Sequence, residues 1–241
     1  MRAIIIMKTG QTIPAIAVCY GDFEDWIIAG SGQPPSAFRT VAIDEGEILP
    51  PLDAVSAVIV TGSPAMVTDD LPWIRTGEQY LRDVVSRGIP VLGICFGHQM
   101  LAQALGGKVD YHPRGREIGT TTVALTPAAK DDALFAGLPA AIPVHVTHMQ
   151  SVTSLPPAAH ILAGNDFDPH HAVRFAESAW GVQFHPEFDA RIMAAYINER
   201  ESRIREEGLD VERLAAEVRE AEVAAGLLRR FAEIVTSDQP Q

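Results

Sequence analysis

The stretch Val91-Leu92-Gly93-Ile94-Cys95-Phe96-Gly97-His98-Gln99 joins an apolar run, typical of a buried strand, directly to a helical pattern. Cys95 falls at the junction, which predicts a sharp strand-to-helix turn, and Gly93 and Gly97 on either side tolerate a crowded backbone. The helix is predicted over His98–Leu105. A buried strand followed directly by a helix is the repeating unit of α/β folds.

The same alternation of strand and helix extends toward the N-terminus. A helix is predicted over Trp73–Ser86, where apolar residues recur at helical spacing and Gly88 follows as a C-cap. Near-continuous apolar runs predict parallel strands covered on both faces, at Ala3–Met7, Thr40–Ile43, Ala57–Val60 and Val91–Ile94. This repetition implies right-handed crossovers and an α/β fold with a doubly wound, mostly parallel sheet and flanking helices.

The second half of the chain has a different pattern. Strand-like pieces separated by proline-rich turns occur at Thr120–Leu125 and Val144–Val146, and Val173–Phe175 with Trp180–Phe184 predicts a hairpin of late strands. No internal repeat or low-complexity linker interrupts the chain. We therefore expect one α/β domain over residues 1–190 and a C-terminal helical extension over residues 191–241 packed on it.

The tail predicts two helices, Asp189–Arg205 and Asp210–Val235. Apolar residues in the second follow a heptad-like spacing. Packing of this stripe on the protein's own sheet or helices is favoured, and a homo-oligomer formed through the C-terminal helices is the alternative.

Composition and charge exclude several classes of protein. Of the 241 residues, 47% are hydrophobic and 21% are charged, which excludes a disordered or fibrous chain. The net charge of −12 argues against nucleic acid or an anionic membrane surface as a partner. No apolar run approaches the roughly 18 residues of a membrane span. Met1–Met7 is too short for a secretory segment, and Cys19 and Cys95 cannot form a disulfide framework, so we expect a cytoplasmic protein.

Cys95 is the candidate nucleophile. A helix N-terminus presents free N–H groups and a positive dipole end, which favour the thiolate form of a cysteine. The N–H of Phe96 is then free to bind the oxyanion that forms when Cys95 attacks a carbonyl. The other interpretation, a small buried hydrophobe, fits Cys19 well. The two flanking glycines favour the nucleophile at Cys95.

The triplet His185-Pro186-Glu187 supplies partners for such a nucleophile. Pro186 pushes His185 into an extended conformation. Because residues two apart in an extended chain point the same way, Glu187 can reach and orient the imidazole. Cys, His and a carboxylate are the three parts of a catalytic triad.

Other histidines were considered as ligands of a metal site and are weak candidates. His145 and His148 lack the glutamate and the helix of a zinc-protease motif. The segment Asp168-Pro169-His170-His171 is more typical of a surface turn than of a ligand set. We therefore expect neither a metal nor another cofactor.

Four segments carry a resemblance to a known family: Val60-Thr61-Gly62-Ser63-Pro64, Gly93-Ile94-Cys95-Phe96-Gly97-His98-Gln99, Thr147-His148-Met149-Gln150-Ser151-Val152 and Gly181-Val182-Gln183-Phe184-His185-Pro186-Glu187. Through them the chain resembles the class I, triad-type glutamine amidotransferases, and in particular free-standing proteins similar to the glutaminase domain of GMP synthase. The resemblance leaves only the tail uncovered.

The resemblance implies a reaction. Cys95 would attack the γ-carboxamide of glutamine, His185 would protonate the departing ammonia, and Glu187 would orient His185. Water would then hydrolyse the glutamyl thioester, and the ammonia would pass to a separate synthase subunit. The resemblance also implies that Gly62 and Phe96 form an oxyanion hole. It implies a set of substrate-binding residues as well: Gln99, His148, Met149, Gln150 and Ser151.

The sequence departs from the family pattern at Gln150, where an aspartate is common. A neutral amide would then face the ammonium group of the substrate, which removes a charge-assisted contact. One alternative is therefore a γ-glutamyl peptidase or hydrolase that uses the same triad on γ-glutamyl peptides or amines. Another is a binding or regulatory protein without turnover, which the intact Cys95, His185 and Glu187 disfavour.

Overall fold

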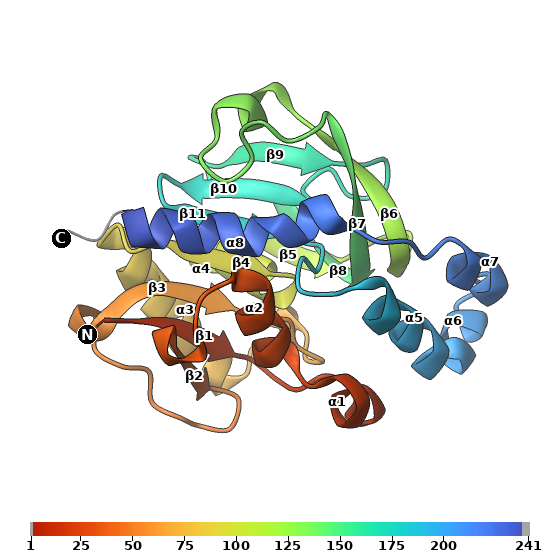
Figure 1. The fold of residues 1–241 in the computed structure, drawn as a ribbon, viewed down its shortest axis with the longest axis horizontal. Coiled ribbons are helices and arrows are strands. Elements are labelled where there is room, and N and C mark those ends of the chain that lie inside the picture. The colour runs from red at the N-terminus through yellow and green to blue at the C-terminus, as the bar shows by residue number, and fades with distance from the viewer. Residues whose placement is uncertain (1, 238–241) are drawn as a thin grey trace.

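The computed structural model describes residues 2–237, which are organised around one large β-sheet (Figure 1). Its strands are β1 (Ala3–Lys8), β2 (Phe38–Ala42), β3 (Val55–Val60), β4 (Val91–Ile94), β6 (Glu117–Leu125), β7 (Ala141–His148), β9 (His160–Gly164), β10 (Ala172–Ala176) and β11 (Ala179–Val182). The order across the nine-stranded sheet is β2-β1-β3-β4-β11-β10-β9-β6-β7. Two more strands, β5 (Lys108–Tyr111) and β8 (Gln150–Ser154), form a separate small sheet.

Helices lie between and after these strands. They are α1 (Pro14–Tyr20), α2 (Phe23–Ser31), α3 (Pro72–Ser86), α4 (Phe96–Ala104), α5 (Ala190–Glu199), α6 (Glu201–Glu206), α7 (Val211–Ala216) and α8 (Glu222–Ser237). Single turns of 3-10 helix occur at Pro35–Ala37, Leu52–Ala54, Val67–Asp69 and Pro127–Asp131.

The sheet has a parallel half and an antiparallel half. Parallel pairs join β1 to β2 and β3, β3 to β4, and β4 to β11. Beyond β11 the pairs with β10, β9, β6 and β7 are antiparallel. The predicted α/β class is confirmed, as is the late hairpin, because hairpin connections produce antiparallel neighbours and helical crossovers produce parallel ones.

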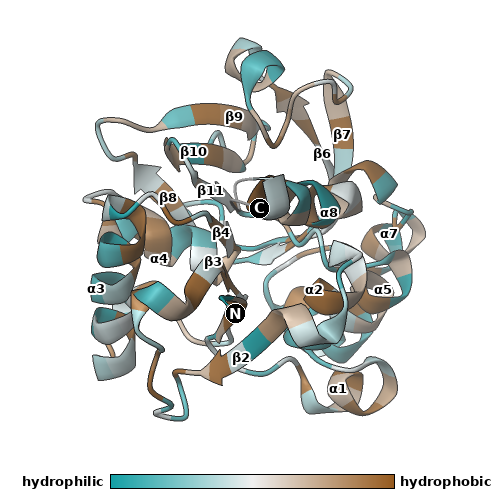
Figure 2. Cartoon of the chain, turned by 60° about the vertical axis from the view of Figure 1, so that its left-hand side comes forward, coloured by the Kyte–Doolittle hydropathy of each residue, from teal (hydrophilic) through white to brown (hydrophobic). Residues whose placement is uncertain are grey.

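Both faces of the sheet are covered by helices. Ile4 and Ile6 of β1 join one apolar cluster with side chains of α2 and α8, whereas Ile5 and Met7 join another with α3 and α4. Alternate residues of a strand point to opposite faces, so a strand buried on both sides reads as a continuous apolar run. In Figure 2, α3 and α4 lie on one side of β3 and β4, and α2 and α8 lie on the other.

The tail corrects the prediction of two long helices. The predicted helix Asp189–Arg205 is broken at Arg200 into α5 and α6, and Asp210–Val235 is broken into α7 and α8. The two pieces of the second predicted helix have different neighbours, because α7 contacts α5 and β6 whereas α8 lies against α2 and β7.

The apolar stripe of α8 packs within the chain. Leu227, Leu228 and Phe231 are fully buried, and a Cβ on Gly30 of α2 would lie 2.6 Å from Leu228 Cδ1. The two helices therefore approach closely, and α8 crosses the molecule in front of the sheet in Figure 1. The homo-oligomer through these helices stays a prediction, as does the division of the chain at residue 190.

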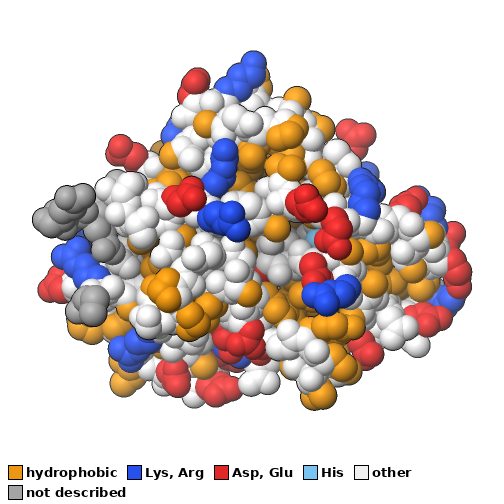
Figure 3. Space-filling view, in the orientation of Figure 1, with side chains coloured by type: hydrophobic (Ala, Val, Ile, Leu, Met, Phe, Trp, Pro, Cys, Tyr) orange, Lys and Arg blue, Asp and Glu red, His pale blue; other side chains and the backbone are white. Residues whose placement is uncertain are grey.

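The surface carries charges of both signs. On the face shown in Figure 3, acidic and basic side chains are interspersed between apolar ones. Within residues 2–237, no helix combines the length and the apolarity that crossing a membrane requires.

Candidate active site

The site lies where the parallel strands end. The segments that follow β3, β4 and β11 contain Gly62, Cys95 and His185 respectively. Carboxyl ends of neighbouring parallel strands meet at one edge, which is where open α/β sheets bind ligands.

Cys95 occupies a strained turn between β4 and α4. Its φ of 52° and ψ of −102° place a non-glycine residue in a region that costs about 1–3 kcal/mol. The flanking glycines are required by close approach. A Cβ on Gly93 would lie 2.4 Å from the Gly97 oxygen, and a Cβ on Gly97 would lie 2.4 Å from the Val60 oxygen. Strand and helix therefore touch backbone to backbone, which fixes the direction of the Cys95 side chain.

His185 is held from two sides. Its Nδ1 lies 2.7 Å from Glu187 Oε1, and both side chains are buried. The Phe188 ring stacks on the imidazole at 4.1 Å between centroids. Nε2 is buried and has no hydrogen-bond partner within the described chain, and His185 lines the same hollow as Cys95. This orientation leaves one nitrogen available for proton transfer beside the sulfur.

The charge state of His185 follows from its neighbours. Burial alone would lower the pKa of His185, but the negative charge of Glu187 and the sulfur of Cys95 raise it to about 10. The ring is therefore a cation at neutral pH and can act as a proton donor.

Two hollows meet at Cys95. We call them the His185 hollow and the Gln150 hollow, after a residue that lines only one of them. Both are lined by Ser63, Pro64, Cys95, Thr147 and Arg200. The His185 hollow is completed by Gln11, Thr12, Ile13, Pro14, Phe23, His185 and Tyr196, and the Gln150 hollow by Ala65, Met66, Phe96, Gln99, Arg116, His148, Met149 and Gln150.

The predicted substrate-binding residues divide into two groups. Gln99, His148, Met149 and Gln150 all line the Gln150 hollow, whereas Ser151 lines neither hollow. Gln99 Nε2 donates to the Gln150 carbonyl at 2.7 Å and to Gln183 Oε1 at 3.0 Å. Gln150 Nε2 donates to Thr68 Oγ1 at 2.6 Å, and its buried Oε1 has no partner within the described chain. The amide of Gln150 thus offers an oxygen acceptor without a negative charge.

The loop after β3 adds a residue that the sequence analysis missed. The carbonyl of Gly62 accepts hydrogen bonds from the hydroxyls of Thr9 at 3.0 Å and Thr61 at 2.9 Å. In a trans peptide the next N–H points the opposite way, so the N–H of Ser63 points away from these hydroxyls. Because Ser63 lines both hollows and Gly62 lines neither, Ser63 is a further candidate oxyanion donor. Phe96 provides its N–H from the first turn of α4.

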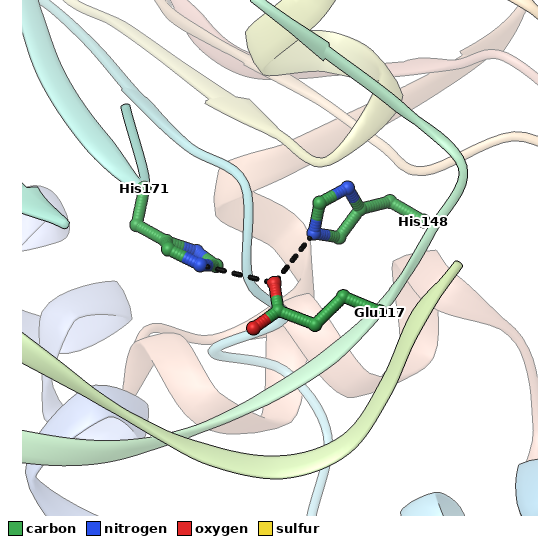
Figure 4. A group of neighbouring side chains, drawn as sticks. All are labelled: Glu117, His148 and His171. Carbon is green, nitrogen blue, oxygen red and sulfur yellow. Dashed lines mark hydrogen bonds and ion pairs between the residues drawn. The ribbon is translucent and has the colours of Figure 1, made fainter. Parts of the chain in front are cut away.

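Glu117 and the buried His148 and His171 form a group next to the Gln150 hollow (Figure 4). Glu117 Oε2 lies 3.0 Å from His148 Nε2 and 3.1 Å from His171 Nε2. Burial would raise the pKa of Glu117, but the two histidines hold it well below its usual range. Glu117 follows Arg116, which lines the Gln150 hollow.

This group has the donor atoms of a metal site, and within the described chain both ring nitrogens of the buried His171 have no hydrogen-bond partner. His148 Nδ1 lies 3.0 Å from the Gln150 carbonyl, so both nitrogens of the ring face acceptor atoms. The expected absence of a metal stays a prediction.

The exposure of Cys19 differs from the expectation. The sequence favoured a buried residue, but Cys19 is exposed on the short helix α1. A helix of 7 residues with one buried side chain leaves most of its positions in solvent. Cys19 is therefore an accessible thiol away from the site.

The chain was compared with known families, proteins and structures. The family model of class I glutamine amidotransferases matches residues 19–201. The glutamine-hydrolyzing GMP synthase of Porphyromonas gingivalis is 40% identical over 137 residues, which are 56% of this chain and 26% of that protein. One subunit of the glutamine-hydrolyzing GMP synthase of Pyrococcus furiosus is 35% identical over 154 residues, which are 59% of this chain and 76% of that relative.

Solved structures show the same fold. A glutamine amidotransferase of Thermotoga maritima superposes with a TM-score of 0.78 at 23% identity, covering 99% of this chain and 100% of that one. The chain spans only about a quarter of the length of the Porphyromonas relative.

Proposed function

Because the chain belongs to the class I glutamine amidotransferase family, we propose that it cleaves the γ-amide of glutamine with Cys95, His185 and Glu187. One observation carries the proposal. The buried imidazole of His185 contacts Glu187 through Nδ1 and leaves Nε2 unpartnered in the hollow that Cys95 lines. A cysteine that has passed its proton to an oriented imidazole is suited to acyl transfer.

The reaction proceeds in two halves. Cys95 Sγ attacks the γ-carbonyl carbon, the oxyanion is bound by backbone N–H groups of Phe96 and of Gly62 or Ser63, and His185 gives its Nε2 proton to the leaving nitrogen. The C–N bond breaks and a glutamyl thioester remains on Cys95. Acylation removes the charge of the sulfur, which is one of the groups that raise the pKa of His185. His185 can then take a proton from the water that hydrolyses the thioester.

The fate of the ammonia is part of the same proposal. The Pyrococcus furiosus relative is named as one subunit of a glutamine-hydrolyzing GMP synthase. We propose that this chain also passes its ammonia to a separate synthase subunit, in the cytoplasm. A γ-glutamyl peptidase is the second candidate, and the size of the His185 hollow favours it.

Ammonia release from glutamine tests the proposal. Cys95→Ala is expected to lower the rate about 10³-fold or more, since the thioester can no longer form. Cys19→Ala is the matched control, and because Cys19 is exposed on α1 we expect wild-type rates. A wild-type rate in Cys95→Ala contradicts the assignment of the nucleophile.

A further inference from the structure

The leaving group of the reaction must enter the His185 hollow. His185 lines that hollow and not the Gln150 hollow. The group that protonates the departing nitrogen has to lie on the nitrogen's side of the scissile carbonyl. The glutamyl part therefore occupies the Gln150 hollow, and the amine departs through the His185 hollow.

The His185 hollow is much larger than ammonia requires. It has a volume of 270 Å³. One water-sized molecule needs about 10–15 Å³ on the same measure. The Gln150 hollow, at 80 Å³, is the smaller of the two. The space beside His185 thus admits an amine that carries further atoms.

Arg200 places an unpaired cation at this hollow. It lies at the break between α5 and α6, and its buried Nε has no hydrogen-bond partner within the described chain. Arg116, the other arginine of the site, differs because its Nε lies 2.8 Å from Glu207 Oε2. Among residues 2–237, no carboxylate lies within ion-pair distance of Arg200.

The surroundings hold the Arg200 guanidinium without neutralising it. It lies over the Tyr196 ring, with 5.8 Å between the guanidinium carbon and the ring centroid. Tyr196 is in turn fixed by a 2.5 Å hydrogen bond to Thr12. Burial, followed by the positive charge of Arg116, lowers the pKa of Arg200. An anion that enters the hollow would relieve both effects.

We propose that the His185 hollow is a subsite for leaving amines that carry a carboxylate, which Arg200 binds. The substrates are then γ-glutamyl amino acids or γ-glutamyl peptides. This inference rests on the proposed thiol chemistry of Cys95. The amide C–N bond breaks as the C–S bond forms, His185 protonates the amine, and water releases glutamate and restores the thiol, with no redox step.

Two substrates that differ in one charge test the proposal. γ-Glutamylglycine and γ-glutamylglycinamide share the same leaving skeleton, and only the first carries a carboxylate. We expect kcat/KM of the wild-type protein to be about tenfold or more higher for γ-glutamylglycine, as for hydrogen bonds to a charged group. Arg200→Gln should bring this ratio close to one, and Arg200→Lys should retain part of it. Arg205→Gln in the neighbouring α6 lies outside both hollows and should keep the wild-type ratio.

Each other outcome overturns the proposal in a distinct way. Equal kcat/KM for the two substrates in the wild-type protein would contradict the carboxylate subsite. This comparison does not depend on whether the variants fold. An equal loss for glutamine and both γ-glutamyl substrates in Arg200→Gln would place Arg200 at the glutamyl end instead. If glutamine turns over and no γ-glutamyl substrate does, only the subsite fails. If neither glutamine nor any γ-glutamyl substrate turns over, the proposed function itself fails and the subsite fails with it.

Discussion

At the scale of single residues, the charge of His185 is the property on which the account depends. Glu187 lies 2.7 Å from His185 Nδ1, and the buried ring remains protonated because of the charges beside it. Removing the carboxylate leaves burial as the main influence, and burial favours the neutral ring. The two functions of the ring, proton donor and then proton acceptor, thus depend on Glu187 together with the sulfur of Cys95.

Glu187→Gln is expected to lower turnover by about 10²-fold or more, because the ring loses both its charge and its orientation.

The pair of His185 and Glu187 also affects the stability of the fold. Since the pKa of His185 is raised from 6.5 to about 10 on folding, its stabilising contribution is complete below pH 6.5 and is lost as the pH rises toward 10. Denaturation across this window should show a steeper decline for the wild type than for Glu187→Gln. Parallel pH profiles would contradict the ion pair.

At the scale of elements, the contact between β4 and α4 depends on glycines. Gly97→Ala is expected to lower the free energy of unfolding by about 3 kcal/mol or more, because the alanine Cβ would lie 2.4 Å from the Val60 oxygen. Gly226→Ala on α8 is the matched control, since nothing lies within 4 Å of its Cβ and alanine favours a helix by about 1 kcal/mol. Urea denaturation of both variants measures the difference, and equal midpoints would contradict the close approach.

Helix α8 gives a second test at this scale. Phe231 is fully buried and meets Trp180 edge to face at 6.4 Å. Phe231→Ala should lower the free energy of unfolding by about 3–5 kcal/mol. Because the stripe packs inside the chain, this loss should not change with protein concentration. A cost that grows on dilution would instead show that α8 forms an interface between copies.

Elements that the sequence predicted share one property, a strong local pattern. The strands β1, β3 and β4 are near-continuous apolar runs, whereas β5, β8 and β9 were not predicted because they are partly exposed and contain polar residues. Helix α2 was also not predicted from the sequence, although Asp22 and Asp25 form a capping box that marks its start. The breaks in the tail could not be predicted, because they follow from neighbours far away in the sequence.

At the scale of the whole molecule, the site joins segments from both ends of the chain. The sequence predicted Cys95, His185 and Glu187 as a group because each lies in a short motif with its own physical reason. It did not identify Ser63 or Arg200 as lining the site. Ser63 is positioned by the orientation of one peptide, and Arg200 reaches the hollows only because the tail folds back against the first helices, where Tyr196 meets Thr12.

The central claim is that Cys95 is a nucleophile in a pocket that recognises a γ-glutamyl group. The most direct test is the intact mass of the protein after incubation with 6-diazo-5-oxo-norleucine, a glutamine analogue that alkylates such nucleophiles. We predict a single adduct on Cys95 that excess glutamine suppresses, that Cys19→Ala retains and that Cys95→Ala abolishes. An adduct on the exposed Cys19, or none while Cys95 still reacts with small thiol reagents, would contradict the account.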